Sequence, residues 1–172
     1  MILGDKGTKM IRLFITGGIK SGKSSYALER AASMEGRKKF LATAIPFDKE
    51  MLNRIIRHKK ERGPEYMTIE EPVNIDIHVE DNIILDCVTV WMNNLFYKGR
   101  EEEWENILGT FLLKNTGNII IVSNELGLGN IPMDPGARKY NEYLAAANKL
   151  IAASMEEVVF MVSGLPLWVK GG

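Results

Sequence analysis

Short apolar runs alternate with helical patterns along most of the chain, and this alternation is the first guide to the fold. Apolar runs bounded by glycine or polar residues predict strands over residues 10–16, 39–44, 66–69, 82–86, 118–123 and 158–162. Apolar positions three and four residues apart predict helices over residues 23–34, 48–61, 101–114 and 137–154, and another through Trp91, Leu95 and Phe96. Such alternation is typical of βαβ units, so we expect a mostly parallel sheet with helices on both faces.

The carboxyl ends of the predicted strands are where a ligand is expected. In open parallel sheets, ligands bind beyond those ends. Here the ends fall on Gly17, Thr43, Asp86, Asn124 and Ser163. The last two begin loops, a Gly/Pro-rich segment over residues 124–136 and the SGLP segment over residues 163–166.

Length, composition and charge fit one domain. The chain has 172 residues, of which 45% are hydrophobic and 26% charged, and these values are ordinary for a single globular domain. We predict a flexible lead-in over residues 1–10 and a single domain over residues 11–172. The 22 Lys and Arg residues balance 22 Asp and Glu residues, which argues against a partner bound mainly through a nucleic-acid backbone.

Cysteine content and hydropathy predict the location of the protein. A single cysteine, Cys87, excludes an internal disulfide and therefore a secreted disulfide scaffold. No apolar stretch approaches the roughly 20 residues that span a bilayer. The first ten residues lack the apolar core of a signal peptide. We expect a cytoplasmic protein without a membrane span.

Residues 17–24 match the pattern G-x-x-x-x-G-K-[ST] in full, between an apolar strand and the start of a helix. That context is the one in which the phosphate-binding P-loop occurs. Glycines let the backbone turn its N–H groups toward phosphate oxygens, and the helix N-terminus adds partial positive charge. Lys23 would reach the β- and γ-phosphates, and the Ser24 hydroxyl would bind Mg²⁺. The motif predicts nucleotide binding, and the alternative is a chance glycine turn before a helix.

Asp86 ends the apolar run over residues 83–85 and is a second candidate for the metal. A carboxylate at a strand end beside a P-loop is suited to hold Mg²⁺ through water. The alternative is a helix N-cap, a position that aspartate also favours. The neighbouring Cys87 is typical of a small buried hydrophobic residue rather than of a nucleophile.

His58 lies on a cationic face of a predicted helix. Arg54, His58 and Arg62 are four residues apart and would share one side of that helix. Two cations beside a histidine disfavour its protonated form, and the same cations suit the phosphates of a nucleotide. From spacing alone, a solvated basic face on which a histidine happens to occur is the simpler interpretation. The other histidine, His78, is interpreted as a surface residue.

Several blocks along the chain form a pattern more specific than any one motif. They are ITGGIKSGKSSYAL, FLATA, D-x-E-M-x-x-R-I-x-x-H-x-x-x-R over residues 48–62, T-x-E-x-P over residues 68–72, LDCVTVWMNNL, SNELGLGNIP and VSGLPLWVK. In this order they resemble the bifunctional adenosylcobinamide kinase/adenosylcobinamide-phosphate guanylyltransferases of cobalamin biosynthesis, and they span nearly the whole chain from Met10 onward. The P-loop alone is unspecific, whereas the histidine segment together with NELGLG and SGLP is specific.

The resemblance implies a RecA-like P-loop α/β fold, assembly as a homotrimer and two reactions. First, an NTP phosphorylates the hydroxyl of the aminopropanol arm of adenosylcobinamide. GTP then guanylylates a histidine with release of pyrophosphate, and GMP passes to adenosylcobinamide phosphate to give adenosylcobinamide-GDP. ATP and GTP are the implied nucleotide substrates and Mg²⁺ the implied cofactor. The implied partners are small molecules, the corrinoid and nucleotides, without nucleic acid.

Matched position by position, the resemblance assigns catalytic roles to His58, the nucleophile, and Lys23. Ser24 and Asp86 would hold the metal. The implied nucleotide-binding residues are Gly17, Gly18, Ile19, Lys20, Ser21, Gly22, Lys23, Ser24, Ala42, Thr43, Ala44, Lys59, Lys60, Glu61, Arg62, Glu70 and Asp86. A histidine nitrogen that attacks the α-phosphorus forms a phosphoramidate and divides one transfer into two easier steps. The match therefore reverses the weighting of His58 that spacing alone favours.

The chain departs from the family pattern after NELGLG. It reads GNIP where the family has GIVP, and in the following helix Asn141-Glu142 replaces Arg-Asp and Lys149 replaces Gln. Two alternatives therefore stay open, a single-activity guanylyltransferase and a RecA-like ATPase or nucleic-acid motor. The motor would need a basic groove with aromatic stacking residues, which the balanced charge does not favour.

Overall fold

A computed structural model describes residues 10–46, 49–129 and 131–172 of the chain. The predicted lead-in, apart from Met10, lies outside the described residues, as do Asp48 and Asn130. The elements of the described part are β1 (Arg12–Gly17), α1 (Lys23–Ala31), β2 (Lys38–Ala42), α2 (Lys49–Glu61), β3 (Tyr66–Glu70), β4 (Asn82–Asp86), α3 (Val88–Tyr97), α4 (Trp104–Lys114), β5 (Asn118–Val122), α5 (Pro135–Ser154), β6 (Glu157–Val162) and β7 (Leu165–Lys170).

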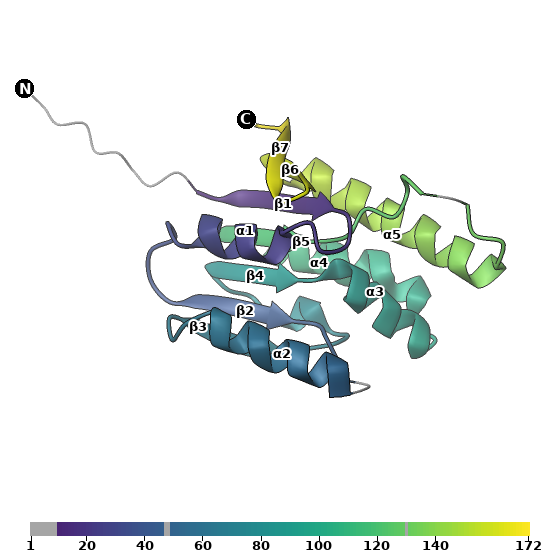
Figure 1. Cartoon of the computed structure of the whole chain (residues 1–172), viewed down its shortest axis with the longest axis horizontal. Coiled ribbons are helices and arrows are strands. Elements are labelled where there is room, and N and C mark those ends of the chain that lie inside the picture. The colour runs from purple at the N-terminus through teal and green to yellow at the C-terminus, as the bar shows by residue number, and fades with distance from the viewer. Residues whose placement is uncertain (1–9, 47–48, 130) are drawn as a thin grey trace, which may run out of the picture.

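The strands form one seven-stranded sheet in the order β3-β2-β4-β5-β1-β6-β7 (Figure 1). Strands β1 to β6 run parallel to one another, and β7 pairs with β6 in the antiparallel direction. The predicted α/β fold with a mostly parallel sheet is confirmed. Because the parallel strands share a direction, their carboxyl ends meet at one edge. In the described part of the chain, no helix combines the length and apolar character needed to cross a membrane.

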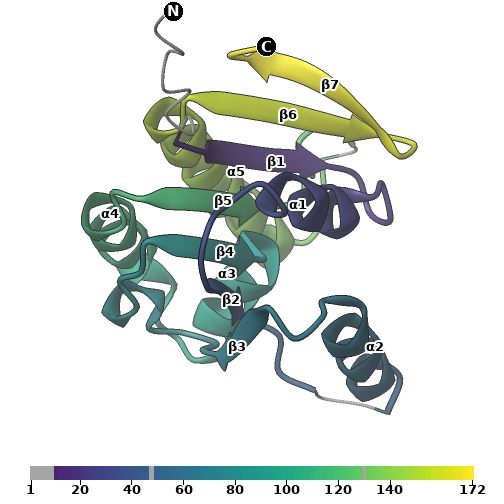
Figure 2. The same cartoon turned by 90° about the vertical axis from the view of Figure 1, so that its left-hand side faces the viewer.

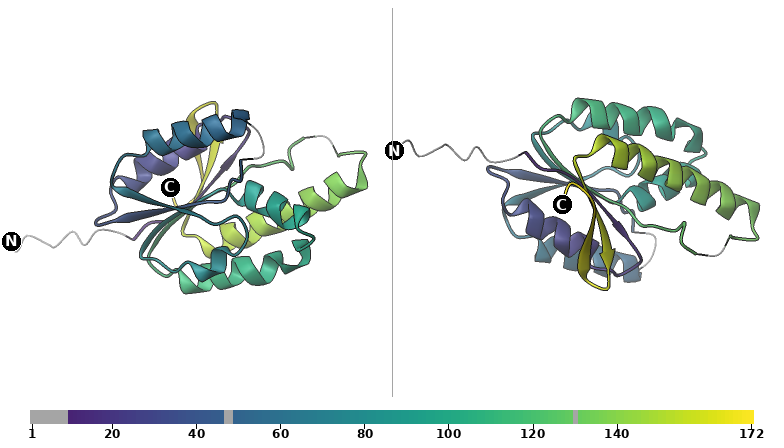
Figure 3. Two further views of the ribbon diagram at one scale, coloured as in Figure 1. Left: turned by 90° about the horizontal axis from the view of Figure 1, so that it is seen from below. Right: turned by 90° about the horizontal axis from the view of Figure 1, so that it is seen from above.

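Helices cover both faces of the sheet, as predicted. Helices α1 and α2 lie on one face and α3, α4 and α5 on the other (Figures 2 and 3). Successive strand residues point to opposite faces, so each inner strand contributes to two cores. In β4, Ile83 and Leu85 join the core beneath α3, α4 and α5, whereas Ile84 joins the core beneath α1. This double burial explains why the inner strands read as continuous apolar runs.

The sequence pattern does not predict the last strand, β7, and predicts only a loop over residues 163–166. Ser163 and Gly164, with φ angles of 50° and 85°, form a two-residue turn that returns the chain along β6. Two features hide this strand in the sequence. All six of its residues are exposed, so it lacks a buried face, and Pro166 is tolerated because β7 is an edge strand.

Helix boundaries differ from the predicted ones by a few residues. Helix α1 ends at Ala31, three residues before the predicted end. The first turn of the predicted helix over residues 101–114 is a 3₁₀ turn, and α4 follows it. Helix α5 begins at Pro135, because the Asp134 side chain accepts a hydrogen bond from the Ala137 N–H at 2.7 Å and caps the helix.

Candidate active site

The predicted P-loop has the expected strand–loop–helix geometry. Strand β1 ends at Gly17, and α1 begins at Lys23 after Gly22, which has a φ of 93°. Gly17 has a φ of 145°, and a Cβ at this position would lie 2.5 Å from the Met161 carbonyl oxygen of β6. Both positions therefore require glycine, one for its close approach to β6 and both for their backbone conformation.

Two other loops hold the P-loop in place. The Glu125 N–H donates to the Gly17 carbonyl at 3.1 Å, and the Gly164 N–H donates to the Ser21 carbonyl at 3.1 Å. These donors belong to the NELGLG and SGLP blocks, for which the sequence patterns predict no structural role. The rule that strand ends share one edge places both loops beside the P-loop, but it does not predict these bonds.

The lysine of the motif is held inside the loop. Lys23 is only 8% exposed, and its Nζ donates to the Gly18 carbonyl at 2.5 Å and to Ser21 Oγ at 3.5 Å. Its ammonium group therefore stands within the turn whose backbone N–H groups are suited to bind phosphate.

We expect Gly17→Ala to lower the free energy of unfolding by about 2 kcal/mol or more, because the added Cβ clashes with β6 backbone and strains the loop. Gly18→Ala is the matched control, since a Cβ there meets nothing within 4 Å. We expect this control to stay within about 0.5 kcal/mol of the wild type. Urea unfolding of the two variants measures both values, and equal stabilities would contradict the close approach.

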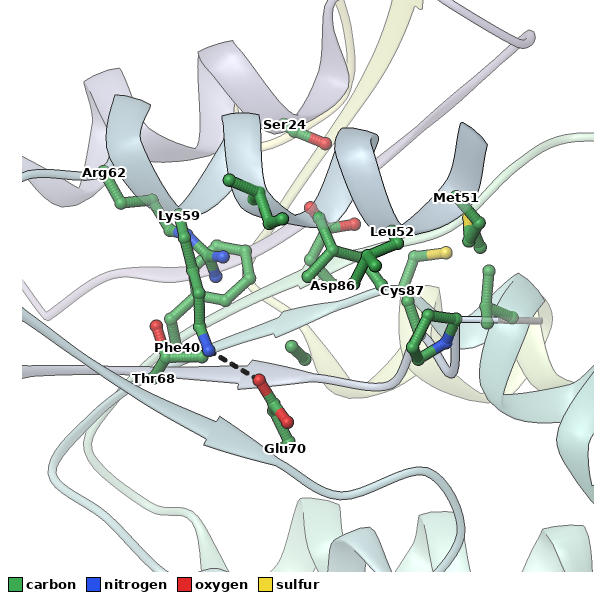
Figure 4. Close-up of a pocket in the computed structure, with 16 residues that line it drawn as sticks. Ser24, Phe40, Met51, Leu52, Lys59, Arg62, Thr68, Glu70, Asp86 and Cys87 are labelled. Carbon is green, nitrogen blue, oxygen red and sulfur yellow. Dashed lines mark hydrogen bonds and ion pairs between the residues drawn. The ribbon is translucent and has the colours of Figure 1, made fainter. Parts of the chain in front are cut away.

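Two cavities open at the carboxyl edge of the sheet. The first, the α2–sheet cavity, has a volume of about 260 Å³ and lies between α2 and strands β2 and β3 (Figure 4). The second, the P-loop cavity, has a volume of about 740 Å³ and is lined by residues 19–25 together with parts of α2. Both cavities are lined by Ser24, Asp86, Cys87 and Val90. The two predicted metal ligands therefore stand where the cavities meet.

The α2–sheet cavity is apolar with a few charged groups. Lys59 of α2 and Glu70 of β3 form an ion pair at 2.6 Å (Figure 4). The Arg62 guanidinium lies 3.8 Å from the centre of the Phe40 ring. Burial lowers the pKa of Arg62, while the carboxylates of Asp86 and Glu70 act in the opposite direction. Arg62 is thus buried in this cavity. It does not belong to the solvated helix face that spacing alone suggested.

Thr43 holds the strand end that carries Asp86. It is fully buried, its hydroxyl donates to the Cys87 carbonyl at 2.9 Å, and the Cys87 N–H donates to the same hydroxyl at 3.0 Å. Its own N–H donates to the Asp86 carbonyl. Ala42 and Ala44 line the α2–sheet cavity, whereas Thr43 does not. The Thr43 side chain therefore positions the strand end, and its contact with a nucleotide stays a prediction.

The Cys87 thiol is unsuited to act as a nucleophile. Burial, together with the Asp86 carboxylate, raises the pKa of Cys87 to about 12. A thiol with such a pKa stays protonated at neutral pH, and only the thiolate is strongly nucleophilic. The interpretation of Cys87 as a small packed residue is in keeping with this.

Comparison with known proteins agrees with these features. A family model described as cobinamide kinase / cobinamide phosphate guanyltransferase matches residues 13–169. The bifunctional adenosylcobalamin biosynthesis protein CobP of Pseudomonas aeruginosa is 34% identical over 94% of this chain and 98% of its own length. The CobU proteins of Escherichia coli and Salmonella typhimurium, with the same description, are each 28% identical over 92% of this chain and 99% of theirs.

The chain belongs to this family. The match to the cobinamide kinase / cobinamide phosphate guanyltransferase model begins in β1 and ends in β7. It therefore includes the P-loop, α2 and every residue that lines the α2–sheet cavity. The resemblance drawn from the sequence blocks is confirmed.

In this member of the cobinamide kinase / cobinamide phosphate guanyltransferase family, α3 fixes the loops beside the cavity. The Asn94 side-chain amide donates to the Thr43 carbonyl at 2.8 Å and to the Pro72 carbonyl at 3.0 Å. Trp91 Nε1 donates to the Val73 carbonyl at 2.7 Å. Both residues lie in the LDCVTVWMNNL block, but neither was singled out as functional. A polar Asn94 within an apolar helix was the available signal, because buried amides need partners.

The histidine segment is helical, as predicted. His58 lies in the last turns of α2, but the side chains of Arg54, His58 and Glu61 fall outside the described residues. Lys60 is exposed.

The second histidine differs from its prediction as a surface residue. His78 is partly buried, and its Nε2 lies 3.9 Å from a carboxylate oxygen of Glu71. Its carbonyl accepts a hydrogen bond from the Asn115 amide at 3.0 Å. It lies in the connection before β4, and it lines neither cavity.

Proposed function

We propose that this protein catalyses both reactions of its family, phosphorylation of adenosylcobinamide by an NTP and transfer of GMP from GTP to adenosylcobinamide phosphate. The observation that carries the proposal is that one P-loop borders two cavities, which share Ser24 and Asp86. A single phosphate-binding loop can then serve a nucleotide and an acceptor. The relatives that the chain matches over their whole length are described as bifunctional, which supports two activities in one domain.

We infer that the nucleotide binds with its phosphates on residues 17–24 and its base in the α2–sheet cavity. That cavity has apolar walls, including Phe40 and Ile55, and a single carboxylate on β3, Glu70. A carboxylate only accepts hydrogen bonds, and guanine offers two adjacent N–H donors that adenine lacks. Glu70 would therefore favour GTP in the guanylylation step. Lys59, which pairs with Glu70, would help to hold this carboxylate in place.

The donors at the junction of the cavities suit Mg²⁺. Ser24 supplies a hydroxyl oxygen and Asp86 carboxylate oxygens, and both line the two cavities. Magnesium prefers oxygen ligands and binds through a few protein groups together with water and substrate phosphates. We infer that these two residues hold it, and when bound it would neutralise charge on the phosphates.

The residues of the chain divide the chemistry into three transfers. In the kinase reaction the acceptor hydroxyl attacks the γ-phosphorus and loses its proton, and the nucleoside diphosphate leaves. Lys23 stabilises the charge that develops on the phosphate oxygens. In the guanylyl reaction a nitrogen of His58 attacks the α-phosphorus of GTP, and pyrophosphate leaves. A phosphate oxygen of the acceptor then attacks the same phosphorus, which breaks the P–N bond and restores the histidine.

We also propose that the protein is a cytoplasmic homotrimer, as the family resemblance implies. Strand β7 presents Leu165, Leu167 and Val169 at the sheet edge, where they are 70%, 58% and 65% exposed. Exposed apolar side chains on an edge strand are normally covered by another element or another chain. The single cysteine supports a reducing compartment.

The proposal is tested by supplying the two half-reactions separately. Purified protein with adenosylcobinamide and γ-labelled ATP is expected to yield labelled adenosylcobinamide phosphate. Protein with α-labelled GTP is expected to take up acid-labile label, which a chase with adenosylcobinamide phosphate should remove. Labelling by GTP without any kinase product would instead support a single-activity guanylyltransferase. DNA-stimulated ATP hydrolysis without either product would support the RecA-like motor.

A further inference from the structure

The P-loop cavity has a second wall that the nucleotide motif does not supply. Glu50, Asn53 and Arg57 of α2 line this cavity opposite residues 19–25. Their spacing of three and four residues places them on one side of the helix. The other side of α2, including Ile55 and Lys59, lines the α2–sheet cavity. Helix α2 therefore separates the two cavities and presents a different surface to each.

Among the described residues of α2 that face the P-loop cavity, Arg57 is the one cation. The other two lining cations, Lys20 and Lys23, belong to the P-loop itself. With a volume of about 740 Å³, the cavity is almost three times as large as the α2–sheet cavity at about 260 Å³. It therefore offers room for a second group beside the phosphates on the loop.

Charge along this side of α2 is graded. Glu50 lies in the first turn and Arg57 seven residues later, which corresponds to about 10 Å along a helix axis. An anion in the cavity is therefore repelled at the start of α2 and attracted near Arg57, next in sequence to His58. A guanidinium can donate two parallel hydrogen bonds to a phosphate, which makes arginine a selective partner for that group.

We propose that the α2 wall of the P-loop cavity is the acceptor site of the guanylyl transfer, and that Arg57 binds the phosphate of the acceptor. The acceptor is a phosphate monoester at the end of a flexible arm. Arg57 holds two of its oxygens while a third attacks the guanylyl phosphorus on His58. A P–O bond forms, the P–N bond breaks, and its electron pair returns to the histidine nitrogen.

This inference rests on the proposed function and adds a distinction between the two acceptors. The kinase acceptor is a neutral hydroxyl and gains little from Arg57. The transfer acceptor carries a phosphate of about two negative charges near pH 7, and it therefore requires a cation. Arg57 is thus a specificity-determining residue for the second reaction.

The test compares Arg57→Ala and Arg57→Lys with the charge-matched control Arg37→Ala. Arg37 is exposed and precedes β2 at the opposite edge of the sheet. We expect Arg57→Ala to raise the KM for adenosylcobinamide phosphate about 10- to 100-fold. Its KM for adenosylcobinamide in the kinase reaction and its rate of labelling by α-labelled GTP alone should stay within about twofold of wild type. Arg57→Lys should recover part of the loss, because it keeps the charge without the paired donors.

The outcomes separate this inference from the proposed function. An unchanged KM for the phosphorylated acceptor, with normal labelling by GTP, overturns the acceptor site alone. If Arg57→Ala also loses labelling in the reaction with GTP and no acceptor, Arg57 serves the nucleotide. This result also overturns the acceptor site. Wild-type protein that takes no label from GTP refutes the proposed function, and the acceptor site with it.

Discussion

Replacement of His58 by alanine is expected to abolish covalent labelling of the protein by α-labelled GTP and to slow guanylyl transfer by at least about a thousandfold. Among the residues that the structure describes at the two cavities, the one thiol is unsuited to replace the imidazole. The Cys87 thiol, which lines both, has a pKa of about 12 and stays protonated. Phosphorylation of adenosylcobinamide by ATP should continue, because the P-loop and α1 lie outside α2.

The other histidine of the sequence provides the control. His78 lies outside the lining of both cavities, so His78→Ala should keep wild-type labelling by GTP. Acid-labile label that persists on the His58→Ala protein would show that another residue is the nucleophile. Loss of kinase activity in the same variant would show instead that the substitution disturbs the fold, and thermal unfolding of the variant distinguishes that case.

Periodicity predicted the sheet because the inner strands are buried on both faces. In β5, Ile119 and Ile121 face one core while Ile120 and Val122 face the other, so the strand is a continuous apolar run that a single sequence reveals. Strand β7 has no buried face and therefore leaves no such pattern. Its pairing depends on the turn at Ser163 and Gly164, in which a residue other than glycine adopts a positive φ, and this is hard to foresee.

The P-loop was predictable because its chemistry lies in eight consecutive residues, whereas its surroundings depend on contacts between distant segments. Thr43 bonds to Cys87 across 44 positions, and Asn94 bonds to Thr43 across 51. A family pattern gives only the identity of such residues, so it does not reveal that the Thr43 side chain holds the backbone after Asp86. The division of α2 into two lining surfaces likewise depends on where β2, β3 and the P-loop lie.

The zero net charge of the chain conceals an uneven distribution. Lys20, Lys23 and Arg57 line the P-loop cavity, and Lys59 and Arg62 line its neighbour. Many acidic residues lie on outer surfaces, such as the 3₁₀ turn Glu101–Glu103, where Lys139 pairs with two carboxylates. Overall neutrality is thus compatible with a site for triphosphates, because only the local field acts on a bound phosphate at physiological ionic strength.

Replacement of Lys23 is expected to impair both reactions, in contrast to the selective effect at His58. Both reactions begin with a nucleotide whose phosphates lie on the P-loop, and Lys23 is the cation held inside it by Gly18. We expect Lys23→Ala to lower kcat/KM of phosphorylation and the rate of labelling by GTP by about a hundredfold or more. Steady-state kinetics with ATP and single-turnover labelling with α-labelled GTP measure the two effects.

A second variant separates loss of charge from loss of packing. Lys23 is buried, so alanine also removes its aliphatic stem, whereas Lys23→Met keeps an unbranched stem without the ammonium group. We expect Lys23→Met to be as inactive as Lys23→Ala but closer to wild type in unfolding free energy. Lys114→Ala removes a lysine from the end of α4, at the amino edge of the sheet, and should leave both reactions unchanged. A Lys23→Met protein with wild-type nucleotide affinity and turnover would remove Lys23 from the catalytic site, because its charge would then contribute to neither reaction.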